Sequence, residues 1–371
     1  MVDAIGVGIL GMGSFLPPRI RENDFWIASL NVPNDEARRK DFLSIERSAA
    51  GEKNEVLPEI AAAMAQYAGD PFCGARRRHV IDDEADTSDM EAEAARRAMR
   101  EARVRPDEID LVIVNSLTPD QLSPSNAPAL QAKLELGRAA GWSLDVGGAS
   151  FQPQLLTATA LIQTGVYRRI LLVVSQAASR VVDYTTPGSA MLGDGAAAVV
   201  VGEIPRGYGV VGHWTRTDGS LRDGVVLAAV VDGAPQPRWW EASRGATCYT
   251  SFDLRVGKST GLRTTQFCRE ACLGALAGAG LTMDDVALYV GNQCMGWHVD
   301  ACRRTLGLPV EKVMNTFAEV GHIGAAAVPF NLERAHRAGK LRDGDFVLMY
   351  SSGAGYTNAA AVYRWRAPGK P

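Results

Sequence analysis

Two stretches of the chain decide the fold, because they repeat one plan of helix, acidic turn and buried strand. The first is EAARRAMREARVRPDEIDLVIVNS (residues 93–116), and the second is FCREACLGALAGAGLTMDDVALYVGNQ (residues 267–293). In each stretch a helical pattern precedes a short run rich in Val, Ile or Leu. A repeat period well above about 50 residues is too long for a solenoid. It predicts two similar halves instead.

Further apolar runs extend both copies of the repeat. ILLVVSQ (170–176) and GDGAAAVVVGE (193–203) are echoed by FVLMYSS (346–352) and GAGYTNAAAVYRW (353–365). Continuous apolar runs suit strands that are covered on both faces, and their alternation with helices predicts a layered α/β fold. We expect strands at residues 111–114, 170–174, 196–201, 286–290, 346–349 and 359–363.

The pattern breaks near residues 204–207, where Pro205 and two glycines interrupt it. We therefore expect an N-terminal half of residues 1–205 and a C-terminal half of residues 206–371. Residues 30–75 fit neither half and are interpreted as an insertion. Residues 217–244, rich in Gly, Asp, Pro and Trp, are predicted to form long loops.

The composition indicates a soluble intracellular enzyme. Of 371 residues, 46% are hydrophobic, and 39 basic against 42 acidic side chains leave a formal charge of -3. This balance lacks the basic stripe of a nucleic-acid binder. No uncharged apolar stretch reaches the roughly 18 residues of a membrane span, and the start lacks a secretion signal. The six cysteines form no CxxC pair. We expect reduced thiols, no bound metal, no membrane contact and a cytoplasmic location.

The first strand contains a motif that invites a false interpretation. Gly6, Gly8 and Gly11 satisfy G-x-G-x-x-G. A dinucleotide site needs these glycines at the turn between a strand and a helix, whereas here they lie inside an apolar strand, and Pro17–Pro18 prevents a helix soon after. Such glycines more often mark a closely packed neighbouring backbone.

The segment SLDVGGASFQPQLLTATALIQTG (143–165) is the first candidate for chemistry. Small residues after an apolar strand allow a sharp turn that places Ser150 at the start of a helix. There, free backbone amides and the helix dipole favour developing negative charge, as in a nucleophile elbow. The alternative is that Ser150 only caps the helix.

Several motifs taken together resemble the ketoacyl synthase III family. The resemblance covers the first strand and residues from about 75 to the end, and implies a thiolase-like duplicated fold with α-β-α-β-α layers and a homodimer. It also implies an enzyme that accepts an acyl group from a thioester onto a cysteine. Most members then condense that group with a decarboxylating malonyl carrier protein, while a histidine and an asparagine hold the thioester oxygen. The motifs are DVGGASF (145–151), GDGAAA (193–198), NQCMGWHVDACRRTLGLPVEKV (292–313), GHIGAAAVP (321–329) and SSGAGYTNAAA (351–361).

The chain departs from that family pattern at all three catalytic positions. Ser150 stands where the family has its cysteine. The family's H-Q-A-N motif reads NQCM (292–295), so Asn292 replaces the histidine. The family's second asparagine, in a G-N-x-x-A-A context, is matched by His322. The imidazole and the amide have exchanged places.

These changes are chemically consistent with one another. A serine hydroxyl is a weak nucleophile at neutral pH and needs a base in hydrogen-bond contact, unlike a thiol. We expect Ser150 to be the nucleophile and His322 the general base and acid, with Asn292 orienting the imidazole or the substrate carbonyl. The backbone amides of Ser150 and Ala354 are expected to form the oxyanion hole.

Other residues leave alternatives open. His298, six residues past Asn292, is a second candidate for the base, whereas His79 and His336 are interpreted as surface or supporting residues. No acid partner of His322 can be named, although Glu319 is close in sequence. A family member without catalysis is a further alternative.

With the family's histidine gone, direct acyl transfer is the leading interpretation, because it needs only a nucleophile, a base and an oxyanion hole. The expected enzyme is an acyltransferase of polyketide or antibiotic biosynthesis that passes an acyl group from a thioester through acyl-Ser150 to a hydroxyl or amine. The alternatives are a starter-unit ketosynthase and a non-catalytic synthase subunit.

The donor is expected to be an acyl carrier protein rather than coenzyme A, and no cofactor is expected. The family's adenine-stacking tryptophan and arginine align with Ala68 and Pro187, so both are missing here. The basic run at Arg76–Arg78 either meets a phosphate or is a solvated turn.

Overall fold

A computed structural model describes residues 5–29, 57–231, 234–236, 246–251 and 253–368. It confirms the predicted α/β class, with a nine-stranded sheet at its centre. All six predicted strands form and belong to this sheet. In spatial order its strands are β12 (Val286–Gly291), β13 (Phe346–Gly353), β14 (Thr357–Arg364), β8 (Gly209–Thr217), β1 (Gly6–Phe15), β7 (Asp194–Ile204), β6 (Ile170–Ala177), β4 (Leu111–Ser116) and β5 (Ala140–Ser143).

Two smaller sheets and a set of helices complete the described chain. The smaller sheets pair β2 (Arg19–Glu22) with β3 (Arg77–Val80), and β9 (Val226–Val231) with β10 (Ala234–Pro235) and β11 (Ala246–Thr250). The helices are α1 (Asn23–Ser29), α3 (Pro58–Ala65), α4 (Thr87–Ala102), α5 (Ala127–Lys133), α6 (Phe151–Gln163), α7 (Leu254–Leu262), α8 (Thr264–Ala279), α9 (His298–Leu306), α10 (Phe317–Val320) and α11 (Ala327–Arg337).

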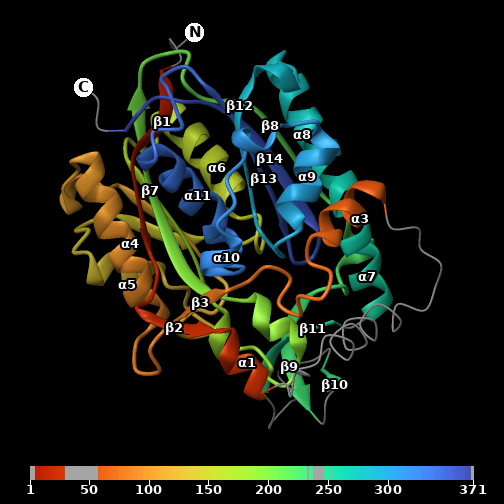
Figure 1. Cartoon of the computed structure of the whole chain (residues 1–371). Helices are drawn as coiled ribbons and strands as arrows, with labels where there is room; N and C mark the ends of the chain where they lie inside the picture. Colours follow the sequence, from red (N-terminus) through yellow and green to blue (C-terminus); the bar gives the residue numbers. More distant parts are fainter. Residues whose placement is uncertain (1–4, 30–56, 232–233, 237–245, 252, 369–371) are drawn as a thin grey trace.

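The helices lie in layers on either side of the sheet strands (Figure 1). Helices α4 and α5 cover the outer face of the strands contributed by the first part of the chain, and their alanines and Met90 share a core with Val112 and Val200. Helices α8 and α9 cover the outer face of β12, β13 and β14. Between them α6 and α11 meet in the largest core, where Phe151 and Phe330 pack. This burial pattern explains why the strands are apolar on both faces.

Strand β1 joins the two groups of strands. It pairs with β7 along nearly all of its length and with β8 at Val7 and Gly209. A side chain at Gly11 would lie 2.5 Å from the carbonyl oxygen of Ala98 on α4, and one at Gly6 would overlap the carbonyl oxygen of Pro205. A side chain at Gly8 would instead meet the side chains of Ile204 and Tyr363. The predicted close packing of a neighbouring backbone is therefore confirmed at Gly6 and Gly11.

The connections agree only in part with expectation. The predicted boundary falls between β7 and β8, and the division at residues 205 and 206 stays a proposal. Most of the predicted insertion, residues 30–56, lies outside the described residues. Helix α3 packs Ile60 and Ala63 against Ala301 of α9 and against Trp297, the residue before that helix. The prediction that residues 217–244 form only loops is wrong, because Val226–Val231 forms β9. That apolar run pairs with β11, from Val230 with Ala246 to Val226 with Thr250, so its partner lies outside the run itself.

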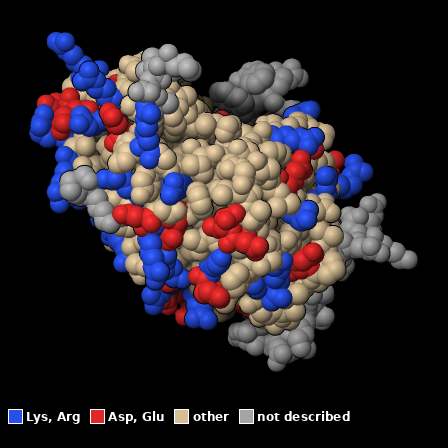
Figure 2. Space-filling view, turned by 90° about the horizontal axis from the view of Figure 1, so that it is seen from above, with Lys and Arg blue, Asp and Glu red and all other residues tan. Residues whose placement is uncertain are grey.

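The described helices do not have the features of a membrane span, and the face of the surface in Figure 2 does not have a basic stripe. Among the described residues, no helix is long and apolar enough to cross a bilayer. Figure 2 shows acidic and basic side chains interspersed over one face, with no continuous basic stripe there. The same part of the chain contains no group of three or more His, Cys, Asp or Glu side chains arranged to hold a metal ion.

A buried carboxyl group ties α4 to the sheet. Glu91 is fully buried and accepts hydrogen bonds from the hydroxyls of Ser116 and Ser175, both at 2.5 Å, and from the amide of Asn126 at 3.0 Å. Burial raises the pKa of Glu91 to about 7, although these three hydrogen bonds oppose the shift. The folded protein therefore holds this proton at pH values where the unfolded chain has released it.

Replacing Glu91 with glutamine is expected to change how stability depends on pH. Because the folded-state pKa is raised, the stabilisation from this carboxyl is present below about pH 4.5 and is lost as the pH rises through 7. The free energy of unfolding of Glu91→Gln, relative to the wild type, should rise by a few kcal/mol between pH 5 and 8, at about 1.4 kcal/mol per pKa unit. Urea denaturation at several pH values measures it. Glu135→Gln, at an exposed carboxylate, is the control, and a pH-independent difference for Glu91→Gln would contradict the assignment.

Candidate active site

The Ser150 side chain is held by hydrogen bonds to the backbone of its own turn. The Ser150 hydroxyl is fully buried, accepts from the amide of Val146 at 2.9 Å and donates to the carbonyl of Gly147 at 2.7 Å. The Ser150 amide also bonds the Gly147 carbonyl, at 3.2 Å. Ser150 stands at the N-terminus of α6, but its side chain bonds no amide of the first helical turn. The capping role that the sequence left open is therefore not observed.

This turn lies directly against the β13–β14 turn from the other end of the chain. A side chain at Gly353 would overlap the carbonyl oxygen of Val146, and one at Gly147 would lie 2.8 Å from the amide nitrogen of Ala354. Gly147 itself has a positive φ of 58°, which favours glycine. Glycine on both sides thus allows the two backbones to touch.

Asn292 lies at the end of β12 and is fully buried. Its amide nitrogen donates to the carbonyl of Ser352 at 2.9 Å and lies 3.8 Å from the sulfur of Cys294. Its side-chain oxygen has no hydrogen-bond partner. The nitrogen of this side-chain amide is thus bonded to the β13–β14 turn, whereas its oxygen has no hydrogen-bond partner.

His322 is held by its backbone. Its amide donates to the carbonyl of Met191 at 2.7 Å, and its carbonyl accepts from the side chain of Gln176 at 2.7 Å and from the amide of Gly193 at 3.1 Å. The ring nitrogen Nδ1 is buried and has no hydrogen-bond partner. Burial, and then the charge of nearby His298, lower the pKa of His322 to about 4. The imidazole is therefore neutral at neutral pH and can accept a proton.

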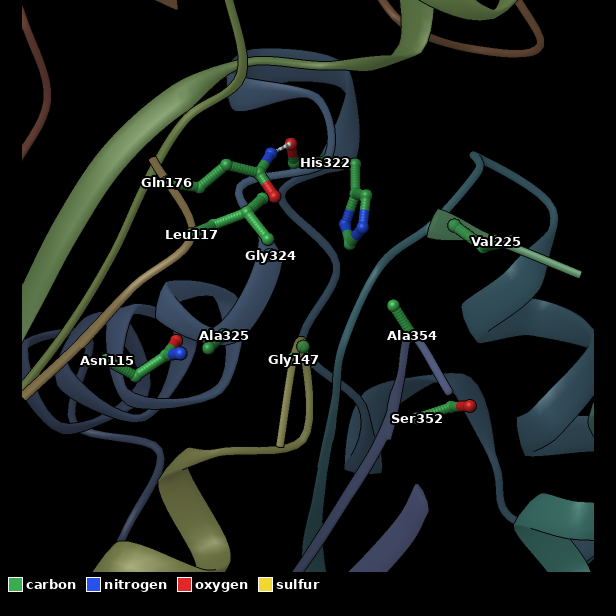
Figure 3. Close-up of a pocket in the computed structure, with 11 residues that line it drawn as sticks. Asn115, Leu117, Gly147, Gln176, Val225, His322, Gly324, Ala325, Ser352 and Ala354 are labelled. Atoms are coloured by element: carbon green, nitrogen blue, oxygen red, sulfur yellow. Dashed lines mark hydrogen bonds between the residues drawn. The ribbon is translucent and has the colours of Figure 1, made fainter. Parts of the chain in front are cut away.

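These elements surround a small cavity of about 70 Å³ (Figure 3). His322 and Ala354 both line it, together with the Gly147–Gly148 backbone. Ser150 and Asn292 are not among the residues that line it. Asn292 is close to the wall, because its amide nitrogen would be 3.8 Å from a side-chain carbon built on Gly148. The lining residues are Asn115, Leu117, Gly147, Gly148, Gln176, Val225, His322, Gly324, Ala325, Ser352 and Ala354.

The remaining candidates take supporting positions. His298 is buried. Its Nδ1 lies 3.2 Å from the carbonyl oxygen of Asn292, and its Nε2 lies 2.8 Å from the hydroxyl of Thr264. His298 therefore contacts the backbone of Asn292. The side chain of Glu319 is exposed. The buried Nδ1 of His322 meets no carboxylate. A conventional triad acid for His322 is therefore not seen among the described residues.

Both interpretations of the basic run fail for Arg78. Its side chain is completely buried, stacks on the ring of Trp26 at 4.2 Å, and donates to the carbonyl of Ala190 at 2.5 Å and to Asn23. It can neither reach a phosphate nor be a solvated residue. It supports the loop that bonds the His322 backbone, whereas Arg76 and Arg77 are exposed.

Sequence reasoning missed two polar residues of the cavity wall, Asn115 and Gln176. Each stands near the carboxyl end of a strand, β4 and β6, and these strands run parallel to one another. The carboxyl ends of parallel strands commonly form binding sites. The position of Asn115 and Gln176 at the ends of two predicted strands could therefore have identified them from the sequence.

The geometry can now be compared with known proteins. A sequence profile described as 3-oxoacyl-(acyl-carrier-protein) synthase III matches residues 144–219, and the profile of its C-terminal part matches residues 276–365. Beta-ketoacyl-(acyl-carrier-protein) synthase III 1 of Bacillus cereus is 31% identical over 294 residues, covering 79% of this chain and 87% of that protein. The chain belongs to the ketoacyl synthase III family. It is thus an enzyme of a transferase-type condensing family.

Other relatives extend the likeness over the whole chain. The synthase III of Caldanaerobacter subterraneus subsp. tengcongensis is 29% identical over 366 residues, covering 98% of this chain and 99% of that protein. The synthase III structure from Thermus thermophilus is similar with a TM-score of 0.79 and 28% identity, over 97% of this chain and 99% of that one. The predicted thiolase-like layered fold is therefore confirmed.

The close approach of Gly353 to the Val146 carbonyl predicts that a methyl group added at residue 353 lowers the stability of the protein. Gly353→Ala is expected to lower the free energy of unfolding by about 1–3 kcal/mol, because the new carbon overlaps the Val146 carbonyl and the two turns must separate. Thermal unfolding measures the loss. Gly261→Ala is the matched control, since a side chain at that α7 glycine meets open space. Equal melting temperatures for Gly353→Ala and the wild type would contradict the described contact.

Proposed function

We propose that this synthase III family member is an acyltransferase. It would take an acyl group from a thioester of an acyl carrier protein, hold it on Ser150, and pass it to a hydroxyl or amine of a natural-product acceptor. The observation that carries this proposal is the neutral His322 imidazole. His322, whose Nδ1 has no hydrogen-bond partner, lines the same cavity as the Gly147–Gly148 backbone that leads into Ser150. A serine nucleophile requires such a base.

The first half-reaction forms an ester and releases a thiol. The Ser150 hydroxyl leaves the Gly147 carbonyl, and its oxygen attacks the thioester carbonyl carbon while His322 accepts its proton. The new C–O bond forms, the C–S bond breaks, and His322 returns the proton to the leaving thiolate. The Ala354 amide at the cavity wall is the available donor to the oxyanion, because the Ser150 amide bonds Gly147 in the resting turn.

The second half-reaction repeats these steps with the acceptor. His322 removes a proton from the acceptor hydroxyl or amine, whose oxygen or nitrogen attacks the acyl-Ser150 carbonyl. The C–Oγ bond breaks, and the proton passes through His322 to the Ser150 oxygen. Thioester, acceptor and products balance without an oxidant, a metal or a cofactor.

Decarboxylative condensation is the second candidate, and the comparisons favour it. The curated relatives are named beta-ketoacyl-(acyl-carrier-protein) synthase III. The priming beta-ketosynthase of the R1128 polyketide pathway shares the fold, with a TM-score of 0.79 at 24% identity over 99% of this chain and 98% of that one. Condensation needs donors to an enolate oxygen, but the Asn292 side-chain nitrogen already donates one hydrogen to the Ser352 carbonyl and directs the other toward the sulfur of Cys294 at 3.8 Å. These two contacts favour direct transfer as the proposed function.

Two further proposals follow from the family. We propose a carrier-protein donor because the residues aligned with the coenzyme A adenine site, Ala68 and Pro187, have neither a tryptophan nor an arginine. We also propose a cytoplasmic homodimer that acts in polyketide or antibiotic biosynthesis.

The covalent intermediate can be tested directly by intact-protein mass spectrometry. Incubation with an acyl carrier thioester is expected to add one acyl mass, which peptide mapping locates on Ser150, and Ser150→Ala should prevent the addition. If the wild-type protein gained no acyl mass, a covalent acyl-Ser150 intermediate would be excluded. The acyl-enzyme is then offered malonyl carrier protein, or simple alcohols and amines. Ester or amide products support acyl transfer, whereas carbon dioxide with a β-keto product would establish condensation instead.

The base can be tested through the pH dependence of acylation. His322→Ala is expected to slow acylation by about 10² or more, because general-base catalysis is lost. Since the pKa of His322 is about 4, the wild-type rate should be flat from about pH 5 to about pH 8 and fall as the pH approaches 4. His213→Ala, at an exposed histidine, is the control and should behave as the wild type. A wild-type rate for His322→Ala would exclude it as the base.

A further inference from the structure

One wall of the cavity is made of two buried amide side chains. Asn115 and Gln176 are 2% and 1% exposed, and both line the cavity that His322 also faces. They come from neighbouring parallel strands, β4 and β6, which end beside one another. Buried amides normally have their hydrogen-bonding groups satisfied. Unpaired groups on this wall therefore indicate what a ligand should supply.

The orientation of Gln176 follows from its neighbours. Its nitrogen Nε2 donates to two carbonyl oxygens, those of His322 at 2.7 Å and Gly193 at 3.2 Å, which uses both hydrogens. A flipped amide would place its oxygen against these two acceptors. The Oε1 oxygen, turned toward Leu117 and Gly324 in Figure 3, is left without a donor from the described residues.

The orientation of Asn115 follows in the same way. Its nitrogen donates to the carboxylate of Asp145 at 2.8 Å, and that carboxylate oxygen also accepts from the amide of Gly147 at 2.8 Å. A carboxylate only accepts, so the nitrogen must face it. The side-chain oxygen of Asn115 receives no hydrogen bond from the described residues. The wall thus offers two amide oxygens, both acceptors.

The chemistry that matches two neutral acceptors is a hydroxyl group. No acidic side chain is among the residues that line the cavity, so an ammonium group would find no counter-charge there. A plain alkyl chain would leave both amide oxygens buried and unpaired, which is costly. A site built to hydrogen-bond a hydroxyl discriminates strongly against the analogue that lacks it.

The size of the cavity limits the chain that carries this hydroxyl. The cavity leaves about 70 Å³ for the centres of water-sized groups, which is room for several heavy atoms. A chain of a few carbon atoms that carries a hydroxyl group fits this space. Gly147 and Gly148, in the turn before Ser150, line the cavity, so we place the acyl chain of acyl-Ser150 in it.

We infer that the acyl group is a short hydroxyacyl chain whose hydroxyl donates to the side-chain oxygen of Asn115 or Gln176. This inference rests on the proposed acyl transfer and names its donor class. It makes Asn115 a specificity-determining residue, since Gln176 also holds the His322 backbone and its replacement would disturb the base.

The test compares three matched pantetheine thioesters on the wild-type protein. Acylation rates are measured by mass spectrometry with 3-hydroxypropionyl, propionyl and 3-aminopropionyl groups. We expect the hydroxyacyl thioester to react at least about tenfold faster than the propionyl one. Equal hydroxyacyl and propionyl rates would overturn the inference while leaving acyl transfer intact. Preference for the aminoacyl group would also overturn it, and no adduct from any thioester would instead count against the proposed function.

A variant series assigns the preference to the amide. Asn115→Leu keeps a similar side-chain shape without the acceptor, so the ratio of hydroxyacyl to propionyl rates should fall toward one. If the leucine variant does not fold, Asn115→Ser takes its place, because serine is smaller but its hydroxyl can still accept a hydrogen bond. The ratio of hydroxyacyl to propionyl rates of this variant should remain above one. Gln163→Leu, an exposed amide at the end of α6, is the control and should keep the wild-type ratio. An unchanged ratio in a folded Asn115→Leu protein would overturn the role of this residue.

Discussion

The site depends on a direct contact between two backbone turns, Gly147–Ser150 before α6 and Ser352–Ala354 between β13 and β14. Glycines 147 and 353 allow it, because a side chain at either would meet the opposite backbone. The contact places the cavity wall and the Ala354 amide beside the turn that carries Ser150. Asn292 reinforces it by donating to the Ser352 carbonyl. Chemistry at this site is therefore available only when both parts of the chain are folded together.

Neutral groups dominate the electrostatics of this site. Burial holds the pKa of His322 to about 4, so the imidazole enters as a base without a positive charge, and its Nδ1 has no carboxylate partner. Its position is fixed through the backbone by Met191, Gly193 and the Gln176 side chain. A thiolate would gain from a charged imidazole, whereas a serine hydroxyl needs a neutral one to take its proton. This environment suits the exchange of cysteine for serine.

One residue of the cavity wall also contacts the His322 backbone. Gln176 donates from its nitrogen to the His322 carbonyl and lines the cavity, so under the proposed function it would contact both the base and the substrate. Arg78 contributes from further away, because it bonds the loop that carries Met191. Family membership accounts for the architecture, and these local polar contacts distinguish this chain's site from a purely apolar acyl pocket.

The sequence by itself determined the layered α/β class and the six core strands, because periodicity and motif order are local properties. It also predicted an exchange of residue types at positions 150, 292 and 322, which stays a prediction. It predicted β9 as loop and Arg78 as a surface or phosphate-binding residue, since strand pairing and burial depend on distant partners. Only the tertiary structure decided that the Ser150 hydroxyl faces its own turn, that His322 and Ala354 share a cavity, and that Asn115 and Gln176 form its wall. The first relation is a contact within one turn, whose backbone is held by the β13–β14 turn against it. The other two join segments far apart in the chain, which the packing of the two groups of strands brings together.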